Sequence, residues 1–304
     1  MKNQFPGGEW PTMLTPFRDG AVDYPALESL VEWYIANGVS GLFAVCQSSE
    51  MFFLSLEERT SVAKFVKEKA AGRVPVIASG HISDSLEDQI LELNEMAKTG
   101  VDAVILITNR LAGEDESDEV WLANLQTVID RLPREVPLGF YECPYPYKRV
   151  LSPEMTRWCA ENGRFFFLKD TCCDIDQIKA KLAVCKGTNL KLYNANTSTL
   201  LASLRAGAAG YSGVMANMQC PLYAWLCANT EDPRAEKLSD ELTVCSLIER
   251  QLYPVNAKYH LSLEGLPITT QSRSKSDNDL TNTFRTEVEM LRRITGRMCK
   301  EYLS

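Results

Sequence analysis

The sequence predicts an α/β protein of the (β/α)8 (TIM) barrel class, followed by a helical C-terminal extension. Short runs rich in β-branched and aromatic residues recur eight times along the first two-thirds of the 304 residues. Most runs lie about 26 to 35 residues apart, the length of one βα unit, and helical patterns fill the intervals. The alternative is an open doubly wound sheet, but no Gly-x-Gly-x-x-Gly motif opens a helix.

Each predicted strand is a short apolar run, as expected for strands buried on both faces of a parallel sheet. The runs are Thr12–Thr15, Gly41–Val45, Val74–Ala78, Ala103–Ile107, Pro137–Tyr141, Phe165–Leu168, Leu190–Tyr193 and Gly210–Val214.

The predicted helices between these runs have recognisable ends. Ser55 followed by Glu58 is typical of a capping box, and several helical patterns end in glycine, the usual residue after a helix. Helical stripes cover Tyr24–Asn37, Leu56–Ala71, Asp84–Thr99 and Ser117–Leu132. We expect the barrel to occupy residues 1–220 and the helical extension residues 221–304, with no linker between them.

The composition is that of a globular protein, with 45% hydrophobic and 24% charged residues. The net charge of -8 and the lack of a basic run argue against a nucleic-acid partner. No stretch approaches the roughly 18 apolar residues of a membrane span, and the N-terminal residues lack the apolar core of a signal peptide. We therefore expect no membrane partner and a cytoplasmic location.

The ten cysteines and two histidines do not form a metal-binding pattern. No Cys-x-x-Cys pair occurs, and Cys172 and Cys173 are adjacent, so a zinc site is not expected. We expect reduced, mostly buried thiols, and neither a metal nor an organic cofactor.

A lysine follows the sixth predicted strand directly. Lys169 comes after the apolar run Phe165–Leu168, so its amine either reaches water, pairs with Asp170, or lies in a low dielectric that favours its neutral, nucleophilic form. In the last case Lys169 is a candidate Schiff-base lysine.

Tyr141 ends the fifth strand, 28 residues before Lys169. The active site of this barrel class lies at the carboxyl ends of the strands, so we expect the phenol and the amine to meet there. The amine can attack a ketone while the phenol moves protons.

Polar residues follow other predicted strands at the same rim. Gln47, Ser48 and Ser49 form a turn whose N–H groups are suited to binding a carboxylate. Further substrate-binding candidates are Thr15, Ser212 and Asn194, while His81 and Asn196 are equally explained as loop residues.

At these residues the chain resembles the pyruvate-dependent class I aldolase family of dihydrodipicolinate synthase and N-acetylneuraminate lyase. The resemblance covers nearly all of the chain and depends on matches in order and in register. These are Thr15–Asp23, Gly38–Leu42, Leu54 with Glu57–Arg59, Tyr141-x-x-Pro144, Lys169-Asp170, Gly207–Asn217, and Tyr253–Val255 with Lys258 and Gly265.

The resemblance implies a (β/α)8 barrel in which Lys169 forms a Schiff base with pyruvate or a related 2-keto acid. It also implies that Tyr141 shuttles protons, that Ser48 is a partner of the carboxylate and of the tyrosine, and that the protein is a homo-oligomer, a tetramer or dimer.

The chain departs from the family pattern at three places. Cys46–Glu50 replaces the usual Gly-Thr/Ser-Thr-Gly-Glu turn, Asn109–Leu111 stands where the synthases have a relay tyrosine pair, and Tyr145-Pro146 stands where they have a carboxylate-binding arginine. Arg110, Lys148 and Arg149 are the nearby basic residues.

The favoured function is that of a Schiff-base lyase or aldolase that makes or breaks a carbon–carbon bond, with an aldehyde-type second substrate. The main alternative is a Schiff-base dehydratase or hydratase-aldolase acting on a sugar-acid or aromatic-derived keto acid. Dihydrodipicolinate synthase activity itself and a non-catalytic barrel are less favoured.

Overall fold

The computed structural model describes residues 5–304 and contains one curled sheet of eight parallel strands. The strand order is β1-β10-β9-β8-β7-β6-β5-β4. A bridge between Thr12 and Phe43 joins the segment after β1 to β4, so the sheet closes into a barrel. The strands are β1 (Gly8–Glu9), β4 (Leu42–Val45), β5 (Val76–Ala78), β6 (Ala103–Ile107), β7 (Leu138–Tyr141), β8 (Phe165–Asp170), β9 (Lys191–Asn194) and β10 (Gly210–Tyr211). This confirms the predicted (β/α)8 class.

The first strand lies earlier in the chain than expected. It is Gly8–Glu9, whereas Thr12 of the expected Thr12–Thr15 run makes only the isolated bridge. Pro11 has no N–H to donate and interrupts the ladder, although its carbonyl accepts the N–H of Phe43 at 3.1 Å. A short antiparallel hairpin, β2 (Phe17–Arg18) and β3 (Ala21–Val22), follows.

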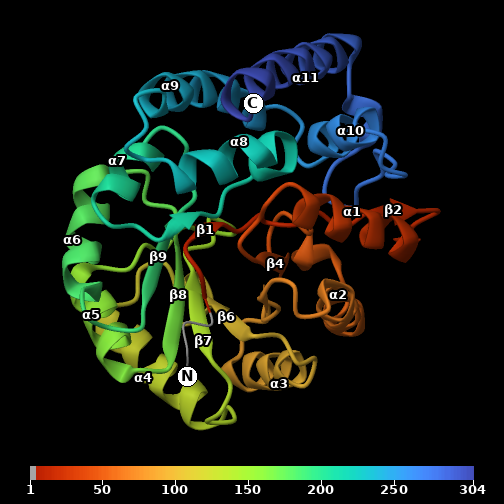
Figure 1. The fold of residues 1–304 in the computed structure, drawn as a ribbon. Helices are drawn as coiled ribbons and strands as arrows, with labels where there is room; N and C mark the ends of the chain where they lie inside the picture. The colour runs from red at the N-terminus through yellow and green to blue at the C-terminus, as the bar shows by residue number, and fades with distance from the viewer. Residues whose placement is uncertain (1–4) are drawn as a thin grey trace.

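Helices surround the barrel in a ring from α1 to α8 (Figure 1). Their bounds are α1 (Tyr24–Ala36), α2 (Leu56–Ala70), α3 (Leu86–Ala97), α4 (Asp118–Asp130), α5 (Pro153–Asn162), α6 (Ile175–Cys185), α7 (Leu200–Arg205) and α8 (Ala216–Ala228). The capping box predicted at Ser55 and Glu58 is present at the start of α2. The expected domain boundary after residue 220 falls inside α8, which is kinked at Gln219 and contains Pro221.

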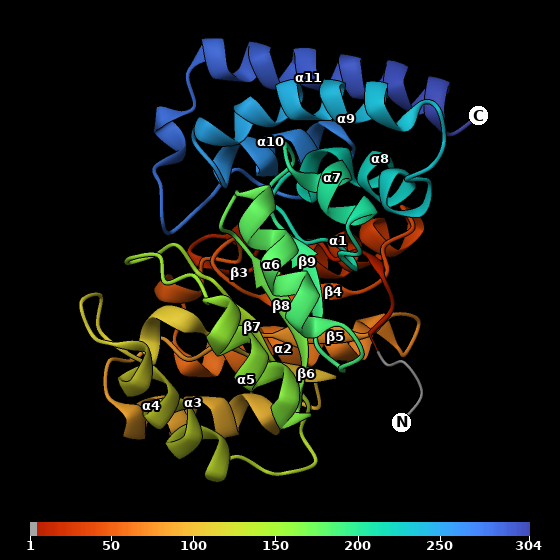
Figure 2. The same cartoon turned by 90° about the vertical axis from the view of Figure 1, so that its left-hand side faces the viewer.

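The C-terminal helices pack outside this ring. They are α9 (Ala235–Cys245), α10 (Val255–Leu263) and α11 (Asn282–Tyr302), and they contact α7 and α8. Figure 2 shows them stacked over one side of the barrel. The connection between α9 and α10 contains the 3₁₀ helix η3 (Ser246–Arg250), and other 3₁₀ turns are η1 (Met51–Phe53), η2 (Thr108–Arg110) and η4 (Asp277–Asp279). No helix within residues 5–304 is both long and apolar enough to cross a membrane.

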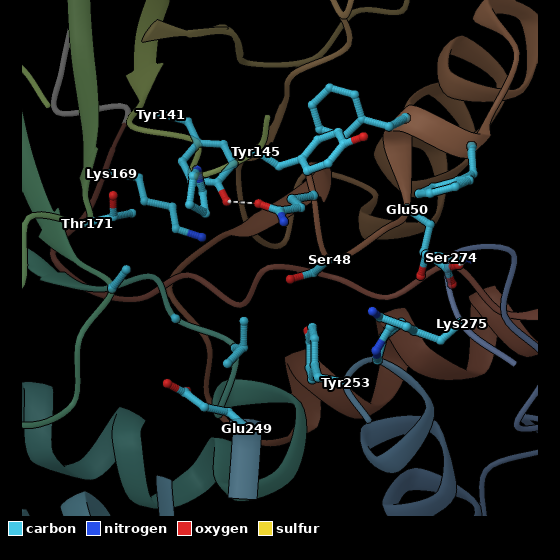
Figure 3. A pocket seen from close by; sticks show the side chains of 18 residues that line it. Ser48, Glu50, Tyr141, Tyr145, Lys169, Thr171, Glu249, Tyr253, Ser274 and Lys275 are labelled. Carbon is cyan, nitrogen blue, oxygen red and sulfur yellow. Dashed lines mark hydrogen bonds between the residues drawn. The ribbon is translucent and has the colours of Figure 1, made fainter. Parts of the chain in front are cut away.

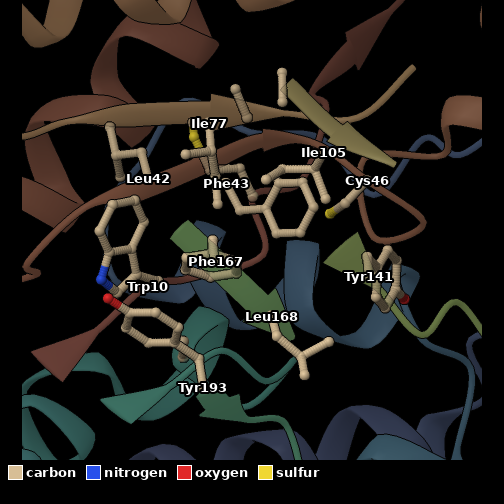
Figure 4. Close-up of a cluster of buried hydrophobic side chains, with 14 of the residues drawn as sticks. Trp10, Leu42, Phe43, Cys46, Ile77, Ile105, Tyr141, Phe167, Leu168 and Tyr193 are labelled. Atoms are coloured by element: carbon tan, nitrogen blue, oxygen red, sulfur yellow. The ribbon is translucent and has the colours of Figure 1, made fainter. Parts of the chain in front are cut away.

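Aromatic side chains fill the barrel interior (Figure 4). Phe167 stacks on Tyr193 with ring centroids 4.1 Å apart and packs against Trp10 at 5.2 Å. Successive strand residues point to opposite faces, so Lys169, two residues after Phe167, also points into the barrel. The aromatic layer therefore forms an apolar floor beneath the Lys169 amine.

Candidate active site

A cavity of about 390 Å³ opens at the carboxyl ends of the strands (Figure 3). Its walls include four of the predicted site residues: Gln47, Ser48, Tyr141 and Lys169. Its size suits a small-molecule ligand.

Lys169 and Tyr141 are directly paired in register on neighbouring strands. Lys169 Nζ lies 4.4 Å from the centroid of the Tyr141 ring and 5.9 Å from that of Phe43. The lysine is only 3% exposed, and no residue within 5–304 makes a hydrogen bond or ion pair with its amine. Burial lowers the pKa of Lys169 to about 8, so much more of the amine is neutral near neutral pH than in an ordinary lysine.

Asp170 does not pair with Lys169, because it points to the opposite face of β8. Its carboxylate contacts Lys181 Nζ of α6 at 2.6 Å, and the same ammonium contacts Glu142 at 2.5 Å. All three side chains are almost completely buried between the barrel wall and α6. Glu142 also accepts hydrogen bonds from the N–H groups of Thr171 and Leu151, each at 2.9 Å. This cluster joins the segments that follow Tyr141 and Lys169.

The Tyr141 hydroxyl points toward Gln47 Oε1, at 3.4 Å. Burial raises the pKa of Tyr141 well above its usual value, and the neighbouring Cys143 raises it further. The phenol therefore carries its proton at neutral pH, beside an amine that readily loses one.

The turn after β4 is held by its own side chains. Ser49 Oγ accepts the N–H of Cys46 at 2.6 Å and donates to its carbonyl at 2.7 Å, while Thr15 Oγ1 donates to the Ser49 carbonyl at 2.8 Å. Ser48 Oγ contacts Thr12 Oγ1 at 3.2 Å, and the Tyr253 hydroxyl interacts with Ser48. The N–H groups of Ser48 and Ser49 interact with the Cys46 thiol, and no oxygen atom within residues 5–304 accepts them.

Glu50 ties this turn to the C-terminal extension. Its φ of 62° places it in the left-handed region, and Lys258 Nζ of α10 contacts its carboxylate at 2.7 Å. The carboxylate also accepts hydrogen bonds from Ser272 Oγ and from the N–H groups of Arg273 and Ser274, at 2.7 to 2.8 Å. Burial opposes ionisation, but these partners lower the pKa of Glu50 below its usual value.

The other predicted substrate-binding residues do not line the cavity. Thr15 and Ser49 support the turn through the bonds above. Asn194 points to the outside of the barrel, where its amide donates to Thr199 Oγ1 and Ser203 Oγ at 2.9 and 3.0 Å. The buried Ser212 hydroxyl has no hydrogen-bond partner among the described residues and adjoins the lining residue Gly213.

His81 lies behind the rim of the cavity and links the segment after β5 to β6 and α3. Its Nε2 accepts the N–H of Ile107 at 2.6 Å and its Nδ1 contacts Gln89 Oε1 at 3.1 Å. Burial lowers the pKa of His81 to about 3, so the ring is neutral.

The basic residues noted in the sequence are also engaged elsewhere. Arg110 pairs with Asp84, and Lys148 Nζ donates to the Thr171 carbonyl at 2.8 Å. Arg149 Nη2 contacts Asp118 at 2.9 Å. None of the three lines the cavity.

Sequence reasoning missed the residues that the C-terminal extension contributes. Glu249 of η3, Tyr253 and Lys275 all line the cavity. Tyr253 belongs to a segment that matches the family pattern, but no strand end or motif pointed to Glu249 or Lys275. Within residues 5–304, no group of three or more His, Cys, Asp or Glu side chains is arranged to hold a metal ion.

Comparison with known proteins places the chain in a family. Residues 6–290 match the model of the dihydrodipicolinate synthetase family. The chain belongs to this family. It is 30% identical over 270 residues to the 4-hydroxy-tetrahydrodipicolinate synthase of Cereibacter sphaeroides, covering 85% of this chain and 89% of the relative. It is 31% identical over 214 residues to the enzyme of that name from Ruegeria pomeroyi, covering 69% and 71%.

Solved structures of the family share the fold. Dihydrodipicolinate synthase from Acinetobacter baumannii, solved in complex with pyruvate, superposes with a TM-score of 0.84 at 25% identity, over 95% of this chain and 99% of that one. Membership of the dihydrodipicolinate synthetase family confirms the expected class of enzyme, a Schiff-base-forming lyase of the class I aldolase type.

Proposed function

We propose that Lys169 forms a Schiff base with pyruvate or a closely related 2-keto acid, and that the enzyme makes or breaks the carbon–carbon bond beyond C3. The observation that carries this proposal is the position of an unpaired, buried amine over the ring of a protonated phenol. A weakly basic amine is the nucleophile that this chemistry needs.

Lys169 and Tyr141 together account for the bonds and protons of the proposed reaction. The neutral Lys169 amine attacks C2 of the keto acid and gives a carbinolamine, which gains a proton at oxygen and loses water to form the imine. The protonated imine then accepts the electron pair of the C3–C4 bond as it breaks, or of a C3–H bond as the proton leaves. Tyr141 is placed to supply and take back protons at both stages.

The turn after β4 is proposed to hold the carboxylate of the keto acid. The N–H groups of Ser48 and Ser49 face the Cys46 thiol and have no oxygen partner among the described residues, and Ser48 lines the cavity. An anion bound there would be stabilised by N–H dipoles. Gln47, whose Oε1 faces the Tyr141 hydroxyl, would orient the phenol toward the bound substrate.

The second substrate is proposed to be an aldehyde, accepted by the enamine or released by the reverse reaction. The relatives from Cereibacter sphaeroides and Ruegeria pomeroyi carry the name of a synthase, yet the segment Asn109–Leu111 has no phenol for a proton relay. The Asn109 amide instead donates to the carbonyls of Cys143, Tyr145 and Tyr147 at 2.7 to 2.8 Å and so shapes the loop. This favours a reaction other than that of the synthase, including the dehydratase or hydratase-aldolase alternative. We also propose a cytoplasmic homo-oligomer.

Deuterium exchange into the methyl group of pyruvate tests the imine chemistry without a known second substrate. In D₂O, the wild-type enzyme is expected to exchange the methyl protons, followed by proton NMR, because the imine makes C3 acidic. Lys169→Ala should abolish this exchange, and Tyr141→Phe should slow it by about 10²- to 10⁴-fold. A Lys169→Ala variant that exchanges at the wild-type rate would refute the proposal.

A further inference from the structure

Among the described residues, two carboxylates line the cavity, and they differ in their partners. Glu50 is fully occupied by Lys258 and by the loop at residues 272–274. Glu249 has no hydrogen-bond or ion-pair partner among residues 5–304, although it is partly buried. Its carboxylate oxygens are not among the buried polar atoms that lack a partner, so they open onto the cavity and are free to bind a ligand.

Glu249 enters the cavity from the C-terminal extension. In Figure 3 it reaches the cavity from the side opposite Tyr141 and Tyr145, below the Lys169 amine. Burial lowers the pKa of Lys169, and the negative charge of Glu249 is one of the nearby groups that act against this shift; burial raises the pKa of Glu249 itself. Glu249 and the Lys169 amine therefore face the same cavity, with Glu249 on the side away from Tyr141.

The other charged residue contributed by this extension lies apart from Glu249. Lys275 lies to the right of Tyr253 in Figure 3, near Ser274, whereas Glu249 lies to its left, and Lys275 is exposed. Solvent screens an exposed ammonium group more strongly than a partly buried carboxylate. Arg250, also exposed, and Lys169 are the cations whose charges act on Glu249. Glu249 is therefore the partly buried acidic group of the extension that faces the cavity.

We propose that Glu249 selects the second substrate by accepting a hydrogen bond from a hydroxyl group on the carbon chain beyond C3, and that it excludes chains with a second carboxylate at that place. This assignment rests on the proposed function, because it takes the keto acid to be bound to Lys169. A charged acceptor strengthens a hydrogen bond to a hydroxyl group, whereas two like charges in a partly buried site repel each other.

Reductive trapping of the imine with single keto acids tests this assignment separately from the proposed function. Pyruvate, 4-hydroxy-2-oxobutanoate and 2-oxoglutarate would each be incubated with the full-length protein and borohydride, and the labelled Lys169 peptide measured against concentration. The half-saturating concentrations of the two longer keto acids are then expressed relative to pyruvate. Pyruvate has no chain beyond C3 and so reports only on the imine.

The wild type is expected to favour the hydroxylated keto acid over 2-oxoglutarate. Glu249→Gln should reduce this preference by at least about 10-fold, the effect of losing a charged hydrogen-bond acceptor, and Glu249→Asp should retain part of it. Glu231→Gln removes an equal charge from an exposed site on the same extension and should change nothing.

Three results would overturn the assignment. An unchanged preference in a folded Glu249→Gln variant, with pyruvate still trapped, removes Glu249 from substrate selection while leaving the proposed function intact. A wild type that traps 2-oxoglutarate as readily as the hydroxylated acid does the same. Failure of the wild type to trap pyruvate refutes the proposed function, and the assignment falls with it.

Discussion

Folding places the Lys169 amine in surroundings that disfavour its charged form. Its ammonium has no counter-ion among the described residues and lies over the rings of Tyr141 and Phe43. The aromatic faces offset only part of the lost hydration, and burial lowers the pKa to about 8 from the usual 10.5. The cost to stability is the same free energy that makes the amine nucleophilic.

Lys169→Met should therefore stabilise the protein at pH 7. The folded-state pKa lies below the unfolded one, so the penalty is present below about pH 8 and disappears as the pH rises toward 10.5. The gain should be on the order of 3 kcal/mol at pH 7 and below about 1 kcal/mol at pH 10. Urea unfolding of both proteins at the two pH values measures it, and equal gains at both would contradict a lowered lysine pKa.

At the scale of elements, strand alternation separates the catalytic candidates from the groups that support them. Tyr141 and Lys169 point into the barrel, whereas the next residue of each pair, Glu142 or Asp170, points outward onto Lys181 of α6. Burial lowers the pKa of Lys181, but the two carboxylates outweigh it and raise the value above normal. The helix thus fixes the outer sides of the two strand ends.

Lys181→Met should destabilise the protein by about 3–5 kcal/mol at pH 7, because it leaves two buried carboxylates without their cation. Lys181 has a raised folded-state pKa, so its contribution is fully present below about pH 10.5, and the loss should be complete at neutral pH. Denaturant unfolding measures the loss.

Lys179→Met is the matched control, since Lys179 is exposed on the same helix, and it should change stability by less than about 0.5 kcal/mol. The double variant Lys181→Met/Glu142→Gln also removes one of the two unpaired carboxylate charges. It should recover part of the lost stability. Equal stability of the Lys181 and Lys179 variants would show that the cluster is not a support.

The barrel could be predicted from the sequence because the local sequence patterns and the packing favour the same strands and helices. Apolar runs spaced by one βα unit identified the strands, and the register of Tyr141 and Lys169 followed from their strand ends. The first strand was misplaced because Thr12–Thr15 is β-rich, while Pro11 and closure against Phe43 decide where the ladder forms. Side chains alternate between the two faces of a strand. Because Tyr193 of β9 points into the barrel, Asn194 points outward and could have been excluded as a substrate-binding residue.

At the scale of the whole molecule, the C-terminal extension completes the site. Lys258 of α10 and the loop at residues 272–274 hold Glu50 at the end of the substrate-binding turn, and Glu249, Tyr253 and Lys275 form cavity walls. No short-range sequence pattern predicts these contacts, because Lys258 and Glu50 are 208 residues apart. Only the packing of α10 and its flanking loops beside the barrel brings them together.

Lys258→Met should weaken keto-acid binding more than it slows chemistry. It leaves the Glu50 carboxylate buried with only neutral hydrogen-bond donors, so the Ser48 and Ser49 N–H groups should lose their fixed geometry. We expect a rise in the pyruvate concentration that half-saturates methyl exchange of roughly 10-fold or more, the effect of a loss of about 1.4 kcal/mol. Lys300→Met, at an exposed site on α11, is the control, and equal half-saturating concentrations in both variants would contradict the coupling.

The central claim, that Lys169 is the Schiff-base lysine, is tested most directly by reducing the protein with borohydride in the presence of pyruvate and mapping the modified peptides by mass spectrometry. The account predicts one stable adduct, on the peptide containing Lys169, which is absent without pyruvate and absent in Lys169→Ala. An adduct on another lysine, or an unmodified Lys169 after treatment with pyruvate and several other 2-keto acids, would contradict it.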